Sequence, residues 1–121
     1  MRSGLVDGRI RAPSSIAAAL ARGRQCEREA EQIRQQLADP ARRERAGAGY
    51  DDWQRKARRA LGLHEEEARQ LAAWVHAAEQ VLGLARGLYE IARDVEEDDL
   101  DDDERALLER AEAHLAALGA R

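Results

Sequence analysis

Phenylalanine and threonine are missing from this 121-residue chain, and large apolar side chains of any kind are scarce. Aromatic residues make up 3% of the sequence, and Leu, Ile and Val together supply 22 residues. Much of the remaining hydrophobic content is alanine, which favours helix formation but offers little apolar area to bury. We therefore expect a slim helical assembly with a thin core, which gains stability by associating with another copy.

Cys26 is the single cysteine, so no disulfide can form within the chain. This scarcity is typical of a reducing compartment, and the expected location is the cytoplasm. No apolar run approaches the ~20 residues that a membrane-spanning helix needs. Residues 1–13 also lack the apolar segment of a signal peptide. A membrane is therefore not among the expected partners.

The residue patterns of common catalytic and metal sites are missing from the sequence. His64 is followed by three glutamates, but position 68, where a zinc protease needs its second histidine, is alanine. None of the three histidines has a glutamate three residues before it, as the Glu-x-x-His pairs of di-iron bundles require. No glycine-rich phosphate loop is present, and the serines are confined to the N-terminus. We predict a protein that is not an enzyme, with no catalytic, cofactor-binding or metal-binding residues and no cofactor.

Apolar residues recur at helical spacing along most of the chain, and no strand-like alternation is found. The predicted fold class is all-α: an elongated helical hairpin or bundle with coiled-coil-like seams and one long central helix. Residues 1–13 are expected to form an extended N-terminal arm, and residues 14–121 a single helical domain. The predicted helices cover about 14–38, 51–62, 64–95 and 102–118.

Local signals place the ends of these helices. Ser14 or Ser15 can cap the first helix, and Pro40 cannot continue it. Asp39 followed by Pro40 is typical of a cap before a first-turn proline, so residues 40–46 are expected to form one or two helical turns. Gly62 either ends the helix that begins near residue 51 or only kinks a longer one.

The segment 64–95 carries two interleaved apolar stripes that together cover more than half of the helix circumference. A helix that packs on one side only shows a narrower stripe. This helix must therefore contact more than one neighbour, and we expect a homo-oligomer, with a dimer favoured. The residues predicted to associate are Trp74, Val81, Leu84, Leu88 and Ile91.

Charge is distributed unevenly along the chain. Residues 1–62 have a net charge of +6 and residues 63–121 a net charge of −10. The two halves can pair with each other, or they can form two partner-binding surfaces of opposite sign. Residues 94–104 hold nine carboxylates, a density that can fill a basic channel on another protein or cap a helix through Asp101 and Glu104. The acidic residues predicted to bind a partner are Asp94, Glu96, Glu97, Asp98, Asp99, Asp101, Asp102 and Asp103.

A basic segment offers an alternative function. Tyr50 and Trp53 lie among seven basic residues between positions 42 and 59. Basic side chains bind phosphates and aromatic rings stack on bases, so this region is a candidate for nucleic-acid binding. Its basic residues are Arg42, Arg43, Arg45, Arg55, Lys56, Arg58 and Arg59.

The segment from Tyr50 to Trp74 shows a recognisable pattern. It contains Tyr50-Asp51-Asp52-Trp53, then Arg55-Lys56-Ala57, Ala60-Leu61, Glu65-Glu66-Glu67, Leu71 and Trp74. This pattern resembles small helical accessory proteins of unassigned function that phages and prophages encode. The resemblance implies no catalytic residue, and it implies an accessory role in the host cytoplasm, including inhibition of a host defence complex.

The function predicted from the sequence is therefore that of a non-catalytic protein–protein interaction protein, in its sharpest form a phage-encoded inhibitor of a host complex. Two alternatives stay open. One is a nucleic-acid-binding accessory protein that uses the basic region 42–59. The other is a virion or scaffold component whose role is assembly.

Overall fold

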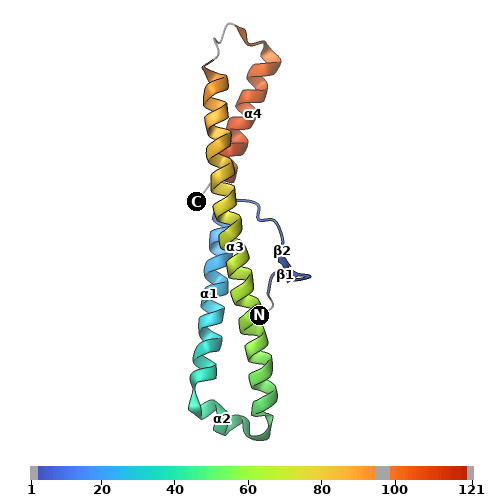
Figure 1. Cartoon of the computed structure of the whole chain (residues 1–121), viewed down its shortest axis with the longest axis vertical. Coiled ribbons are helices and arrows are strands. Elements are labelled where there is room, and N and C mark those ends of the chain that lie inside the picture. The colour runs from blue at the N-terminus through green and yellow to red at the C-terminus, as the bar shows by residue number, and fades with distance from the viewer. Residues whose placement is uncertain (1–2, 95–98, 120–121) are drawn as a thin grey trace.

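The structure, a computed structural model, describes residues 3–94 and 99–119 and consists almost entirely of helices (Figure 1). This confirms the predicted all-α class. The elements in chain order are β1 (Leu5–Val6), β2 (Arg9–Ile10), α1 (Ile16–Ala38), α2 (Pro40–Ala46), the 3-10 turn η1 (Gly47–Gly49), α3 (Tyr50–Arg93) and α4 (Asp102–Leu118).

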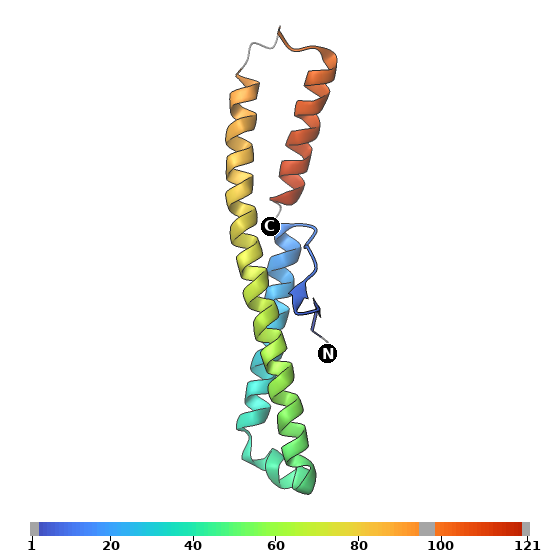
Figure 2. The same ribbon diagram turned by 45° about the vertical axis from the view of Figure 1, so that its right-hand side comes forward.

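Helix α3 is the long central element, and the other helices pack along it. Its 44 residues extend over about 66 Å at the rise of an α-helix. α1 runs antiparallel to the first half of α3, and α4 returns along the second half (Figure 1). In Figure 2, the end of α4 lies above the start of α1, so that the two helices form a nearly continuous row beside α3. Ile16, Leu82 and Gly119 line the junction, where the two helix dipoles meet head to tail.

The structure decides the alternative left open at Gly62: α3 continues through it without a break, so the predicted helices 51–62 and 64–95 are one helix. A glycine inside a helix costs only about 1 kcal/mol relative to alanine. Packing of α1 against this part of α3 outweighs that cost. The helix ends at Arg93, slightly before the expected residue 95, which lies outside the described residues.

The predicted caps are confirmed. Ser15 Oγ accepts a hydrogen bond of 3.0 Å from the N–H three residues later, at the start of α1. Asp39 Oδ1 accepts one of 3.0 Å from the N–H two residues later, and Pro40 occupies the first turn of α2. Asp101 Oδ1 accepts one of 2.7 Å from the N–H of Glu104. These caps depend only on neighbours within a few residues, which is why the sequence predicts them.

The N-terminal arm is a small β-hairpin, which the sequence analysis did not predict. β1 and β2 pair antiparallel, with Leu5 opposite Ile10. The two turn residues, Asp7 and Gly8, both have positive φ angles, of 52° and 76°. An Asp-Gly pair with positive φ at both positions is the usual two-residue hairpin turn. Strands of two residues each are too short to show an alternating pattern, so only the turn indicated them.

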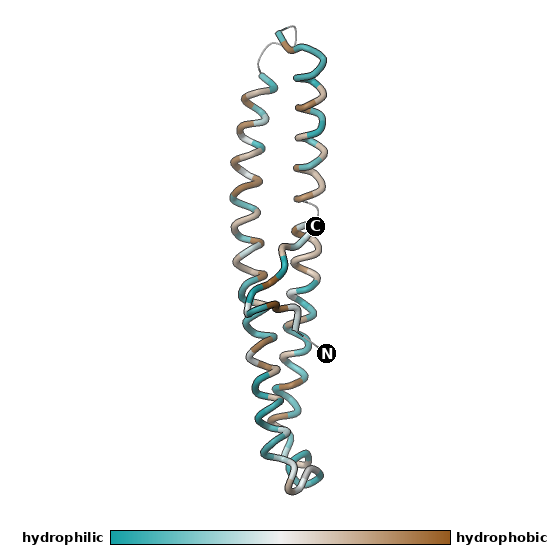
Figure 3. The backbone as a smooth tube through the Cα atoms, turned by 90° about the vertical axis from the view of Figure 1, so that its right-hand side faces the viewer, coloured by the Kyte–Doolittle hydropathy of each residue, from teal (hydrophilic) through white to brown (hydrophobic). Residues whose placement is uncertain are grey.

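The core is thin and is concentrated where α1 meets α3. Figure 3 shows hydrophobic and hydrophilic positions alternating along the helices, as expected for elements that pack on one side. Ala19, Cys26 and Leu71 form the central cluster of buried residues. α4, by contrast, has no fully buried residue. No helix within the described ranges is long and apolar enough to cross a lipid bilayer.

Candidate functional site

The second half of α3 presents an exposed row of large apolar side chains. Their exposed fractions are 59% for Val81, 71% for Leu84, 68% for Leu88 and 68% for Ile91. They recur at spacings of three and four residues, so they lie on one face of the helix. We call Val81, Leu84, Leu88 and Ile91 the apolar stripe. These are four of the five residues that the sequence predicted for self-association.

The apolar stripe is free of charge along its length. At 100° per residue, the charged residues of α3 between Leu71 and Ile91, which are Glu79, Arg86 and Glu90, fall on a different face. The neighbouring positions on the stripe side are small or uncharged. α4 covers another side of α3, where Leu82 is buried. The stripe therefore remains exposed after the chain has folded.

Trp74, the fifth predicted residue, lies elsewhere. It is half-buried and packs against the core cluster of Ala19, Cys26 and Leu71. Trp74 lies about two helical turns before Val81, in the part of α3 that packs against α1, which explains why it is less exposed than the apolar stripe. The indole therefore contributes to the fold, and the exposed part of the stripe begins at Val81.

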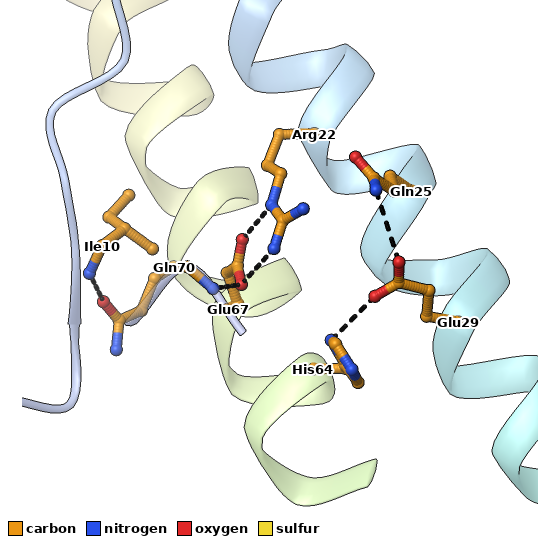
Figure 4. A network of polar contacts seen from close by, with 8 residues as sticks. Ile10, Arg22, Gln25, Glu29, His64, Glu67 and Gln70 are labelled. Atoms are coloured by element: carbon orange, nitrogen blue, oxygen red, sulfur yellow. Dashed lines mark hydrogen bonds and ion pairs between the residues drawn. The ribbon is translucent and has the colours of Figure 1, made fainter. Parts of the chain in front are cut away.

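A second candidate site is a buried polar cluster where α1, α3 and the hairpin meet (Figure 4). Glu67 on α3 is only 2% exposed. Arg22 on α1 donates from Nε to Oε2 at 2.5 Å and from its terminal nitrogen to Oε1 at 3.0 Å. The backbone N–H of Gly4 also donates to this carboxylate. Burial raises the pKa of Glu67, but these donors and the Cys26 thiol outweigh it and lower the pKa below its ordinary value.

The same cluster holds the hairpin against α3. Gln70 Oε1 accepts a hydrogen bond of 2.9 Å from the N–H of Ile10, and Gln70 Nε2 donates one of 2.7 Å to the carbonyl of Gly8. At Gly4, an added Cβ would lie 2.8 Å from Glu67 Oε2, closer than real Cβ contacts allow. Position 4 therefore requires glycine as long as the carboxylate stays in place.

Not all polar atoms of the cluster are satisfied. His64 is 3% exposed, and its Nδ1 lies 3.4 Å from Oε2 of Glu29. Neither atom has a hydrogen-bond partner within the described part of the chain, although Gln25 Nε2 donates to the other oxygen of Glu29 at 3.3 Å. Buried polar atoms are normally paired, so an unpaired histidine nitrogen here requires an explanation.

Cys26 completes this group. Its side chain is fully buried, and burial together with the Glu67 carboxylate raises the pKa of the thiol to about 12. One ligand atom each from Cys26, His64 and Glu67 lie within 4.8 Å of one another. A thiol, an imidazole and a carboxylate at this distance are the donor set of a transition-metal site.

The sequence patterns did not reveal this cluster, because the two metal-site spacings compared with the chain were the zinc-protease pattern and the order Glu-x-x-His. The chain has the reverse order, His64-x-x-Glu67, and a second pair of the same spacing, Cys26-x-x-Glu29. Each pair lies on one face of its helix. Two such pairs were the available signal, but only the register of α1 against α3 brings them together.

The predicted basic residues gather at the other end of the α1–α3 hairpin, and the structure gives many of them local partners. Arg42 lies over the Trp53 ring, with its guanidinium carbon 4.4 Å from the ring centroid, and Arg43 lies over Tyr50 at 5.8 Å. Asp52 pairs with Arg55 at 2.6 Å and with Lys56 at 3.0 Å. The remaining predicted residues, Arg45, Arg58 and Arg59, are exposed, with Arg45 also 3.4 Å from Asp39.

The predicted acidic residues divide between the end of α3 and the start of α4. Asp94 caps α3 and Asp101 caps α4, and Asp99, Asp102 and Asp103 are exposed. Acids at the start of a helix are stabilised by its dipole, which gives Asp101, Asp102 and Asp103 a structural role in starting α4. Glu96, Glu97 and Asp98 lie outside the described residues.

No family model, curated protein or solved structure matches this chain.

Proposed function

We propose that this chain is a non-catalytic interaction protein that pairs with a second copy of itself through the apolar stripe. The observation that carries the proposal is the exposure of four large side chains in one row after folding. Burying a side chain of this kind is worth about 1.5–3 kcal/mol when it starts fully exposed, so each of these contributes about 1–2 kcal/mol. Such a row is typical of an interface.

The lack of charge on this face favours a second copy as the occupant. A twofold interface brings the same patch of both subunits together, so any charge in the patch meets a like charge. The stripe meets that requirement, since the charged side chains of this part of α3 lie on another face. The α3–α4 half of the molecule also gains most from pairing, because α4 has no fully buried residue of its own.

We also propose that the chain binds a protein other than itself. The resemblance of the segment from Tyr50 to Trp74 to phage accessory proteins favours a host protein in that role. The exposed acids at the start of α4, Asp99, Asp102 and Asp103, offer such a partner a charged contact at the end of the molecule.

Sedimentation velocity tests the self-association. We expect the wild-type chain to sediment as a dimer at micromolar concentration, and a double variant Leu84→Gln, Leu88→Gln to sediment as a monomer with unchanged helical circular dichroism. Leu107→Gln is the control, because Leu107 is also a largely exposed leucine, at 60%, but lies on α4. It should remain dimeric. A wild-type monomer, or a double variant that still dimerises, would contradict the proposal.

A further inference from the structure

We propose that Cys26, Glu29, His64 and Glu67 form a binding site for a single zinc-like divalent metal ion between α1 and α3. Each helix supplies two ligands three residues apart. Cys26, His64 and Glu67 already lie together, and Glu29 joins them through its position 3.4 Å from His64. This site is separate from the apolar stripe, and it does not depend on the proposed dimer.

Two buried atoms without hydrogen-bond partners support the site. His64 Nδ1 and Glu29 Oε2 have no hydrogen-bond partner in the described ranges, and their contact at 3.4 Å is an ion pair only when His64 is protonated (Figure 4). Two ligands held about 2.1 Å from a tetrahedral ion lie about 3.4 Å apart. An ion bound to both atoms removes the cost of burying them unpaired.

The chemical types of the four side chains also suit zinc. Thiolate, imidazole and carboxylate are the ligands that zinc takes in proteins. Cys26, His64 and Glu67 already place one ligand atom each within 4.8 Å of one another, so small side-chain movements bring them to bonding distance. The polar partners of the carboxylates also suit a metal site: Gln25 orients Glu29, and Arg22 with the Gly4 N–H orients Glu67.

The charge around the proposed site and its access to the surface also suit a metal ion. A divalent ion with one thiolate and two carboxylates carries a formal charge of −1, which the guanidinium of Arg22 neutralises. The thiol releases its proton to solvent when the metal binds. Cys26, Ala30, His64 and Ala68 line a surface pocket, which gives an ion a path to two of the four ligands, Cys26 and His64.

Titration of the full-length, untagged, reduced and metal-free chain with Zn²⁺ and Co²⁺ tests the site. We expect one equivalent of either ion to bind. The Co²⁺ form should show the ultraviolet charge-transfer band of a thiolate ligand, and Zn²⁺ should raise the melting temperature. His64→Gln and Glu29→Gln should weaken binding more than about 10-fold, since even residues that only orient ligands often cost that much. Cys26→Ser should remove the band.

Matched controls are available in the chain. His76→Gln and Glu31→Gln change an exposed histidine of α3 and an exposed glutamate of α1, and they should bind metal like the wild type. Failure of the wild type to bind one equivalent would overturn the proposal. So would binding without the thiolate band, because the ion would then occupy carboxylates elsewhere. The wild-type spectrum decides the question even if a variant does not fold.

Discussion

Glu67 is the residue on which three parts of the chain depend. It is buried on α3, it binds Arg22 of α1, and it binds the backbone of Gly4 before the hairpin. A buried carboxylate is unfavourable unless donors surround it, and here the donors come from segments 45 and 63 residues away in sequence. The pairing therefore fixes tertiary structure that no local pattern specifies.

Replacing Glu67 tests this role at the residue scale. Glu67→Gln removes the charge that pairs with Arg22, so we expect the free energy of unfolding to fall by about 2–3 kcal/mol, measured by urea denaturation with chelator present. The adjacent Glu66→Gln is the control, because Glu66 pairs with Arg69 on the exposed surface. A loss for Glu67→Gln no larger than for Glu66→Gln would contradict the role assigned to the buried pair.

The structure changes the role that we assign to Cys26 and His64. In the sequence, Cys26 is a single cysteine with no partner for a disulfide, and His64 is a histidine without a ligand pattern. The structure places them in one buried group with Glu67. Their proximity follows from the register between two antiparallel helices, and therefore could not be read from residue spacing.

At the scale of elements, the continuity of α3 is the main departure from the sequence-based expectation. Glycine is common just past the end of a helix, so a break at Gly62 was one of the two outcomes that the sequence left open. α1 packs along α3 on both sides of this position. Burial of apolar side chains along that contact keeps the helix intact across a residue that weakens it by only about 1 kcal/mol.

Alanine substitutions distinguish a continuous helix from a broken one. Gly62 has open space around its Cβ position and ordinary helical φ, so Gly62→Ala should raise the free energy of unfolding by about 0.5–1 kcal/mol. Gly47 has a φ of +56°, and Gly47→Ala should lower it by a similar amount or more. Thermal or urea unfolding measures both. Destabilisation by Gly62→Ala would show that residue 62 ends a helix after all.

At the scale of the whole molecule, the two halves differ in how well they are packed. The α1–α3 half holds the buried core cluster and the Glu67 network, whereas α4 pairs with α3 through half-buried residues such as Leu108 and Leu115. The exposed stripe lies in this weaker half. A second copy bound there adds contacts where the single chain has fewest.

Hydrogen exchange measures this difference. Amides of α4 should exchange faster than amides of the buried part of α1, because opening α4 exposes little apolar surface. In the Leu84→Gln, Leu88→Gln variant we expect exchange in the second half of α3 to rise above wild-type levels, with α1 unchanged. Equal protection of α1 and α4 in the monomeric variant would argue against two halves of unequal stability.

The sequence by itself determined the helical class, a cap at Ser14 or Ser15, the caps at Asp39 and Asp101, and the apolar row from Val81 to Ile91. These features depend on residues within a turn or two of each other, so periodicity and capping chemistry are enough to predict them. Only the tertiary structure decided that α3 runs through Gly62, that the arm forms a hairpin, and that Cys26 meets His64. The first and last of these outcomes depend on how α1 registers against α3, a long-range packing choice in which many weak contacts act together. The hairpin depends on its Asp7-Gly8 turn and on hydrogen bonds to Gln70 of α3.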